Sequence, residues 1–144
     1  MSFEERWRRE GERGEAIVEF ATLTVLMVVL VAQLIVALAR VEAGAFATEA
    51  AARELARLSS QGADAAAAAA PFAVELAFTD QGLDPSKANY TLTCVTRCGQ
   101  PGEKVSVEVT YRLRIPGIGM LLPERSAIPM RAHYVVELGE ALSP

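Results

Sequence analysis

The sequence predicts an α+β protein in which a long N-terminal helix crosses a membrane and then packs on a small antiparallel sheet. Residues 20–39 form an uninterrupted run of uncharged, mostly apolar side chains. Residues 41–58 continue with alanine and other good helix formers. Residues 104–115 instead alternate between apolar and polar side chains, which is the pattern of a half-buried strand. Helical patterns followed by strand patterns are typical of the α+β class.

The apolar run at residues 20–39 has the length of a membrane span. At about 1.5 Å of rise per residue, a helix of this length covers roughly 30 Å, the thickness of the hydrocarbon core of a bilayer. Its only strongly polar members are Thr22, Thr24 and Gln33. We therefore expect a single-pass membrane protein with its span at about residues 20–39.

The arginines predict the orientation of this span. Arg40 alone directly follows the run, whereas four arginines precede it: Arg6, Arg8, Arg9 and Arg13. Basic residues near a span favour the cytoplasmic side, and acidic residues count for little in this rule. The N-terminus is expected in the cytoplasm, and the C-terminal part outside the cytoplasmic membrane.

The helix is predicted to continue past the membrane, so that residues 15–61 form one element. Four apolar side chains recur at helical spacing on one face: Ala47, Ala51, Leu55 and Leu58. Two ion pairs, Glu49 with Arg53 and Glu54 with Arg57, support the remaining surface. We expect the apolar face to pack on the sheet, although its small side chains would also let another helix or strand approach closely. The Ser-Ser-Gln-Gly sequence at 59–62 is the stop signal.

A second, short helix is predicted within residues 64–81. Alanine, the best helix former, fills positions 65–70, and Pro71 is expected to break or restart the helix. Gly82 should close it, and the turn at 82–85 should return the chain to the sheet.

Three strands are predicted at residues 90–95, 104–115 and 128–138, all rich in Val, Thr, Tyr and Ile. In the second strand one face is apolar and should pack on the long helix, while the other faces water. A turn at 100–103 joins the first two strands, and 116–119 begins a longer connection to the third. Residues 62–144 are thus expected to form the extracytoplasmic α+β domain.

Cys94 and Cys98 are the only cysteines. In an oxidising exterior they are expected to form a disulfide, worth about 2 kcal/mol for so short a loop. A fully extended segment would separate their Cα atoms by roughly 13 Å, beyond the ~7 Å that a disulfide tolerates. The bridge therefore requires a turn at residues 95–97.

Composition argues against several classes of function. The formal net charge is −4, and beyond Arg40 there are nine Lys and Arg against twelve Asp and Glu. No continuous basic stripe is available to follow a nucleic-acid backbone. Two thiols and one histidine are too few for a typical zinc site. His133 has no nucleophile at a recognisable spacing in the sequence, so we expect neither an enzyme nor a cofactor.

The most informative segment is residues 13–20, which read RGEAIVEF and join the arginine-bearing head to the apolar run. Glu19 lies at the start of that run. A charged side chain at the middle of a span costs about 3 kcal/mol, and the cost falls toward the interface. An acid placed here invites a functional interpretation.

This arrangement resembles the processing site of type IVb (Flp, or tight adherence) prepilins and of the TadE-like pseudopilins that accompany them. In this resemblance Gly14 ends a cytoplasmic leader of residues 1–14, Glu15 begins the mature chain, and Glu19 and Phe20 are its fifth and sixth residues. The resemblance implies a pilin-like fold, cleavage by a prepilin peptidase and retention in the bacterial cytoplasmic membrane. It also implies a role in assembling or priming Flp pili, with other pilins, pseudopilins and the Tad assembly machinery as partners.

The spacing of the motif has a physical reason. Removal of the leader creates an α-amino group at Glu15, and Glu19 lies one helical turn away on the same face. The resemblance implies that Glu19 pairs with the amino terminus of a neighbouring subunit inside the apolar bundle. A simpler alternative is that Glu19 caps the positive end of the helix dipole, worth about 0.3–1 kcal/mol.

Two features depart from other members of the wider pilin group. Glu15 is charged where many pilin classes begin their mature chain with an aromatic residue, so methylation of the new amine is not assumed. The extracytoplasmic sheet makes the chain larger than a typical major Flp pilin, which favours an accessory role.

Two other interpretations remain open. The small residues at 37–39 could be a signal-peptidase site with cleavage after Ala39, which would release a secreted domain. Two features count against a signal peptide. The apolar region is longer than the 7–15 residues of a signal core, and Glu19 lies near its start. Alternatively, the leader stays uncut and the chain is a membrane-anchored binding module.

Overall fold

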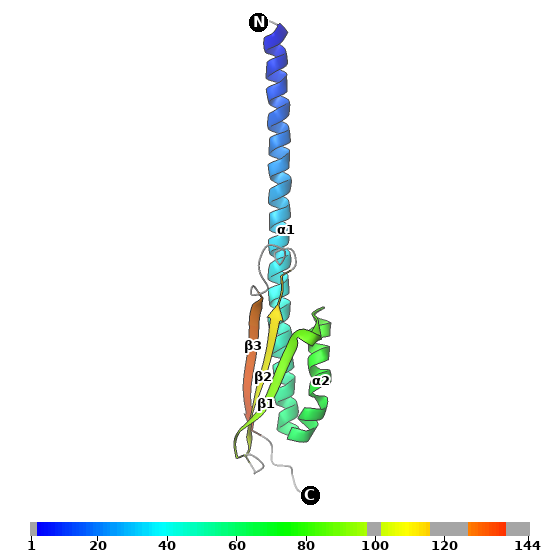
Figure 1. Ribbon diagram of the computed structural model, residues 1–144, viewed down its shortest axis with the longest axis vertical. Coiled ribbons are helices and arrows are strands. Elements are labelled where there is room, and N and C mark those ends of the chain that lie inside the picture. Colours follow the sequence, from blue (N-terminus) through cyan, green and yellow to red (C-terminus); the bar gives the residue numbers. More distant parts are fainter. Residues whose placement is uncertain (1–2, 98–101, 116–126, 138–144) are drawn as a thin grey trace. The chain divides into compact units, whose positions relative to one another are not determined.

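The computed structural model describes residues 3–97, 102–115 and 127–137, with side chains from residue 16 onward. The chain divides into two units, residues 1–38 and 39–144. Figure 1 shows the elements in chain order: α1 (Phe3–Gln61), α2 (Ala63–Asp80), the 3-10 turn η1 (Pro85–Lys87), β1 (Ala88–Thr96), β2 (Lys104–Leu113) and β3 (Ile128–Glu137). A long helix, a second helix and a three-stranded antiparallel sheet confirm the predicted α+β class.

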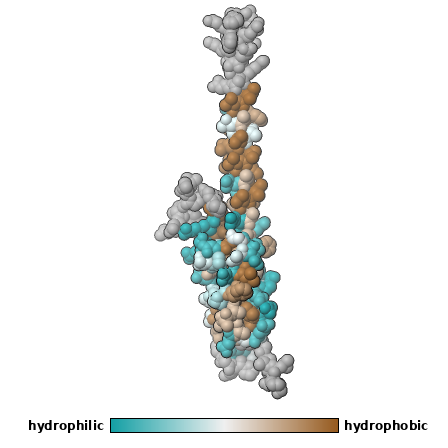
Figure 2. All heavy atoms as spheres, turned by 90° about the vertical axis from the view of Figure 1, so that its right-hand side faces the viewer, coloured by the Kyte–Doolittle hydropathy of each residue, from teal (hydrophilic) through white to brown (hydrophobic). Residues whose placement is uncertain are grey.

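The first unit consists of the N-terminal part of α1. The helix begins at Phe3 and not at residue 15. Residues 3–14 are mainly Glu and Arg, which are good helix formers. From residue 16 onward its hydrophobic side chains are exposed, and Figure 2 shows them as brown atoms.

Within the second unit, residues 41–61 of α1 bury the predicted apolar face. Ala47, Ala51 and Leu55 are fully buried, and Leu58 is partly buried against the same core. The helix ends at Gln61, as the stop signal at 59–62 predicts. Gly62 follows with φ of 144°, a conformation that glycine adopts readily.

Helix α2 passes through Pro71 without a break, so the predicted interruption there is wrong. Proline removes the N–H that would bond to the carbonyl of Ala67, and Ala67 is exposed, so this carbonyl can turn to solvent. The packing of Val74 and Phe78 beyond the proline holds the helix together. Its end is as predicted, since Gly82 has φ of 64° and the Leu83 N–H bonds to the Phe78 carbonyl at 2.9 Å.

The sheet has the order β1-β2-β3, and both pairings are antiparallel. The three strands lie where the sequence predicts them, with ends that differ by one or two residues. Ile115 lies beyond the end of β2, and Leu138, Gln100, Pro101 and the connection at 116–119 lie outside the described residues. The alternation of β2 is confirmed by its buried side chains, which are Val105, Val107, Val109, Tyr111 and Leu113.

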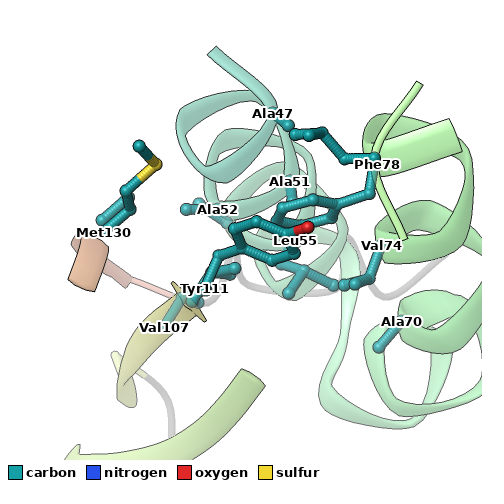
Figure 3. Packing of buried hydrophobic residues seen from close by; sticks show 14 of the residues in the cluster. Ala47, Ala51, Ala52, Leu55, Ala70, Val74, Phe78, Val107, Tyr111 and Met130 are labelled. Carbon is teal, nitrogen blue, oxygen red and sulfur yellow. The ribbon is translucent and has the colours of Figure 1, made fainter. Parts of the chain in front are cut away.

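The core lies between this face of the sheet and the two helices (Figure 3). The rings of Phe78 from α2 and Tyr111 from β2 stack with centroids 4.7 Å apart. Helix α1 approaches β3 closely at Gly44, where an added Cβ atom would come within 2.5 Å of the Met130 sulfur. The small side chains on this face of α1 therefore allow it to pack closely on the sheet, as expected from the sequence.

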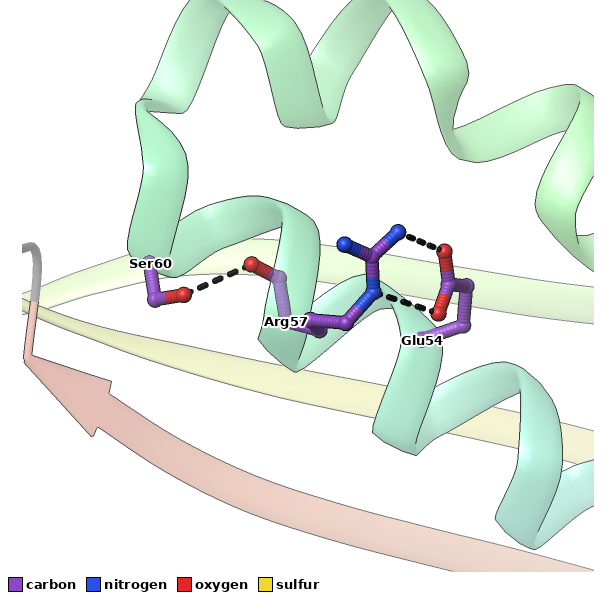
Figure 4. A network of polar contacts seen from close by, with 3 residues as sticks. All are labelled: Glu54, Arg57 and Ser60. Carbon is purple, nitrogen blue, oxygen red and sulfur yellow. Dashed lines mark hydrogen bonds and ion pairs between the residues drawn. The ribbon is translucent and has the colours of Figure 1, made fainter.

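Both predicted ion pairs of α1 are present. The side chains of Arg53 and Glu49 lie 3.1 Å apart, and Arg57 binds Glu54 through two nitrogens at 2.9 and 2.5 Å. Figure 4 shows the second pair together with the Ser60 hydroxyl, which donates to the Arg57 carbonyl at 2.7 Å. These contacts hold the last turns of α1 on their solvent side.

Candidate functional site

The candidate processing and assembly site lies entirely on α1. Gly14, Glu15, Glu19 and Phe20 all have helical backbone, although the side chain of Glu15 lies outside the described residues. Four residues of helix separate Glu15 from Glu19, a rise of about 6 Å along one face. The helix therefore provides the one-turn spacing that the sequence motif predicts.

Glu19 is an exposed acid among exposed apolar side chains. Ile17, Val18 and Phe20 are 68%, 66% and 73% exposed. Among the side chains that the structure describes, none forms an ion pair with Glu19. Its carboxylate is thus available to a partner from outside this part of the chain.

The helix around and beyond Glu19 is apolar on every side. On one side of the helix, Leu26, Leu30 and Leu34 are each more than half exposed. On other sides, Val25, Val28 and Ile35 are exposed to a similar extent. A helix that is hydrophobic all round is normally buried in a large core or in lipid. None of the most apolar window of this helix is buried.

Two polar side chains of this stretch bond within the helix. The hydroxyl of Thr22 donates to the Val18 carbonyl and that of Thr24 to the Phe20 carbonyl, both at 2.8 Å. In lipid every polar group must find its partner inside the protein, and these two do. By length and composition this is the one helix in the described chain that could cross a membrane, a property that an N-terminal signal sequence shares.

The start of α1 bears on the alternative role of Glu19. Because the helix begins at Phe3, Glu19 lies about four turns inside it. The field of the helix dipole falls off within the first turn, so Glu19 caps nothing in the uncut chain. Only removal of residues 1–14 would bring it close to a helix terminus.

Gly14 marks a weak point of the helix. Glycine in a helix interior costs about 1 kcal/mol relative to alanine, and Gly11 lies only one turn earlier. The backbone before Glu15 is therefore easier to open than the aliphatic stretch that follows.

The predicted disulfide stays a prediction, because Cys98 lies outside the described residues. Cys94 lies in β1, whose register shifts between Cys94 and Thr96. Arg97 then adopts φ of 56°, a turn conformation that is uncommon for a residue with a side chain. The chain thus begins to turn at the place that the bridge requires.

His133 has a neighbour that the sequence analysis missed. The Ser106 hydroxyl lies 2.8 Å from its Nε2 atom, because β2 and β3 pair across 27 positions of sequence. Glu108 lies opposite His133 and binds Arg131 at 3.1 Å. These side chains line the exposed polar face of the sheet, where their cross-strand contacts stabilise the β2–β3 ladder.

A polar contact also joins α1 to the sheet. The Tyr134 hydroxyl on β3 donates a hydrogen bond to the Glu49 carboxylate on α1, which Arg53 also contacts. The Tyr134 hydrogen bond, aided by Arg53, holds the pKa of Glu49 below its ordinary value. No local pattern indicates this contact, since 85 positions separate the two residues.

Phe46 is an exposed aromatic side chain, 67% accessible, on the same part of α1. It borders one hollow of about 390 Å³ between α1 and α2, and another of about 410 Å³ between α1 and β3. The first hollow is lined by Glu49, Arg53 and Asp80 among other residues, and the described residues include no group of three or more potential metal ligands.

Comparison of the chain with protein-family models, with curated proteins and with solved structures finds no match.

Proposed function

We propose that this chain is a TadE-like minor pseudopilin that acts in the assembly or priming of tight adherence (Flp) pili. The observation that carries the proposal is Glu19, an acid without an ion-pair partner in the described chain, at the start of an unburied apolar helix and five residues after Gly14. The proposed partners are a prepilin peptidase, other pilins or pseudopilins, and the Tad assembly machinery. The chain has no catalytic role in this proposal and uses no cofactor.

In this proposal residues 1–14 are a cytoplasmic leader and residues 20–39 cross the bacterial cytoplasmic membrane. Residues 62–144 then lie outside that membrane, together with the end of α1, and the protein is found in the membrane or associated with the pilus. The apolar surface of α1 supports the placement in lipid, because every large side chain from Ile17 to Leu38 is about half exposed or more.

The role proposed for Glu19 follows from the energetics of burial. An unpaired carboxylate within an apolar bundle costs several kcal/mol or takes up a proton. Pairing with the α-amino group at the cut end of a neighbouring subunit would remove this cost. The two groups can meet in only one register of the two helices. Glu19 thereby selects how the helices dock.

The interpretation as a secreted domain receives less support. Cleavage after Ala39 would fall inside α1, which continues as helix to Gln61. The first residues after the cut would still be tied to the core through Ala43 and Ala47. A signal peptidase would have to unwind this segment, which is held by packing.

Mass spectrometry of the protein purified from membranes of a host with a Tad system tests the proposal. A mature chain that begins at Glu15 supports the pseudopilin. A chain that begins at Arg40 would establish the secreted domain, and an intact N-terminus at Met1 or Ser2 would establish the uncut anchored module.

Two variants separate processing from assembly. Gly14→Leu should retain the leader, because the bulky side chain replaces the glycine that the peptidase recognises. Glu19→Ala should be inserted and folded as before but should no longer co-purify with the assembly machinery. Glu19→Asp keeps the charge and serves as the matched control. Unchanged co-purification of Glu19→Ala would show that the charge pairing is wrong.

A further inference from the structure

The two edges of the sheet differ in how they are protected. Within the described residues β1 and β3 each have one neighbouring strand, so each presents a second side without a partner strand. Proteins usually protect such edges with charges or proline. Strand β3 has these features in Pro129, Arg131 and Glu137, whereas β1 reads ANYTLTCVT and contains neither a charge nor a proline.

The side chains of β1 are also accessible in the part of the chain that the structure describes. Six of its nine residues are exposed, and the other three are only partly buried. Tyr90 and Leu92 point to the core side of the sheet, opposite the buried Val109 and Val107 of β2, yet Tyr90 remains 36% exposed. An apolar side chain on the core side stays accessible because the described residues place no further strand beside it.

Strand β1 is complementary to itself in an antiparallel arrangement. Its regular pairing with β2 covers residues 88–94, before the register shift, and Thr91 is the centre of this segment. A two-fold axis at Thr91 would place Tyr90 of each copy opposite Leu92 of the other. It would also place Thr91 opposite Thr91 and Asn89 opposite Thr93. Aromatic–aliphatic and Thr–Thr pairs are favourable cross-strand neighbours.

We propose that β1 is a self-association edge, through which two copies of this chain pair antiparallel about Thr91 to form one continuous six-stranded sheet. The free N–H and C=O groups of the edge specify an extended strand as the occupant. The uncharged sequence of β1 and its self-complementary pairs favour a second β1 as the occupant. The nearest charged residues, Lys87 and Arg97, lie beyond the paired segment, and Lys87 already binds Asp84 at 3.2 Å.

Such a contact is isologous, so it closes after two copies and does not propagate. Each pair would bring the core-side apolar residues of two edges together and bury them. The interface therefore predicts a dimer of the extracytoplasmic domains. This inference does not depend on cleavage at Gly14 or on the role of Glu19.

The test compares one substitution on each edge of the sheet. Thr91 and His133 lie on either side of Glu108, both exposed and both on the polar face. Thr91→Lys and His133→Lys therefore each place a lysine beside Glu108, which the fold should tolerate. Only Thr91→Lys also places two lysines opposite each other in the proposed dimer, a destabilising pair.

The mass of the full-length protein in detergent is measured by sedimentation over a range of protein concentrations. We expect a dimer for the unaltered protein and for His133→Lys. We expect the dimer dissociation constant of Thr91→Lys to rise about tenfold or more. A monomer for the unaltered protein, or equal dimerisation of both variants, would overturn the proposal and in the second case would point to the membrane span.

Cross-linking provides a second readout that does not rely on destabilisation. Directly opposed residues of antiparallel strands have Cα atoms about 4.5–5.5 Å apart, within the range of a disulfide. Thr91→Cys should therefore yield a dimer linked through the substituted positions, as identified by mass spectrometry of its peptides. His133→Cys is the control, and equal cross-linking of both variants would contradict the proposed register.

Discussion

Residues 16–38 and residues 41–61 belong to the same helix, α1, but their surfaces are organised in opposite ways. The first stretch is apolar all round, and its large side chains are exposed on every side. The second stretch buries one face of small and aliphatic side chains, and it has ion pairs on its solvent side. The difference is the one that the proposed membrane span requires, with lipid around the first stretch and water on one side of the second.

One polar contact distinguishes the second stretch from the first. Thr22 and Thr24 bond to carbonyls of their own helix, whereas Glu49 reaches across to Tyr134 on the sheet. Thr48 and Ser60 of the second stretch also bond to carbonyls of α1, so only the contact of Glu49 with Tyr134 links this stretch to the tertiary fold in that way. Matched substitutions in the two stretches therefore test this comparison directly.

The largest difference should come from matched leucines. Leu55→Ala leaves a cavity in the core and should lower the free energy of unfolding by about 3 kcal/mol. Leu34→Ala, at a side chain that is 59% exposed, should leave it unchanged. Urea unfolding of the protein in detergent, followed by near-ultraviolet circular dichroism, measures both. Equal losses would mean that residues 16–38 also pack against the folded domain.

The second largest difference should come from a lysine introduced into each stretch. Val28→Lys places an ammonium at the middle of the proposed span and should cost about 2.5–3.5 kcal/mol on insertion. Ala50→Lys, at an exposed position of the second stretch, should have no such effect. Extraction of membranes with alkaline carbonate measures the result. Complete retention of Val28→Lys in the membrane fraction would argue against a span centred there.

The contact between Tyr134 and Glu49 should contribute less. Tyr134→Phe removes one hydrogen bond to a carboxylate and should destabilise the domain by about 1 kcal/mol, a modest value because the Glu49 side chain is 44% exposed. Thr22→Val is the matched change in the first stretch and should not alter unfolding of the domain. Thermal unfolding by circular dichroism compares the two.

The same contact has a predictable pH dependence. The pKa of Glu49 is lower in the folded than in the unfolded chain, chiefly because of the Tyr134 hydrogen bond. Its stabilising effect is therefore complete above the unfolded pKa, about 4.3, and is lost as the pH falls through the lower folded pKa. Tyr134→Phe should reduce this loss as the pH falls below the unfolded pKa. An unchanged acid profile would show that Tyr134 does not set the pKa.

The smallest expected effect is a gain in stability. The Ser59 hydroxyl is buried, and it has no hydrogen-bond partner among the residues that the structure describes. Ser59→Ala should stabilise the domain by up to about 1 kcal/mol, since it removes a buried unpaired group and favours helix. Ser60→Ala, at the neighbouring exposed residue, should change stability little. A loss of stability in Ser59→Ala would indicate that the hydroxyl has a partner.

Much of this molecule is determined by local patterns in its sequence. The apolar run at 20–39, the buried face of Ala47, Ala51 and Leu55, and the alternation of β2 each repeat over neighbouring residues. Helical and strand periodicities are properties of such short segments, so the elements could be predicted from them. The candidate site could also be predicted from the sequence, because all its residues lie within two turns of one helix. They are Gly14, Glu15, Glu19 and Phe20.

Only the tertiary structure decided how distant segments meet. Helix α2 continues through Pro71, because the packing of Val74 and Phe78 outweighs one missing hydrogen bond. The tertiary structure also brought Tyr134 to Glu49 and placed β1 at one edge of the described sheet. Contacts of this kind depend on strand order and register, which are fixed by the shared core and not by any local repeat of residues.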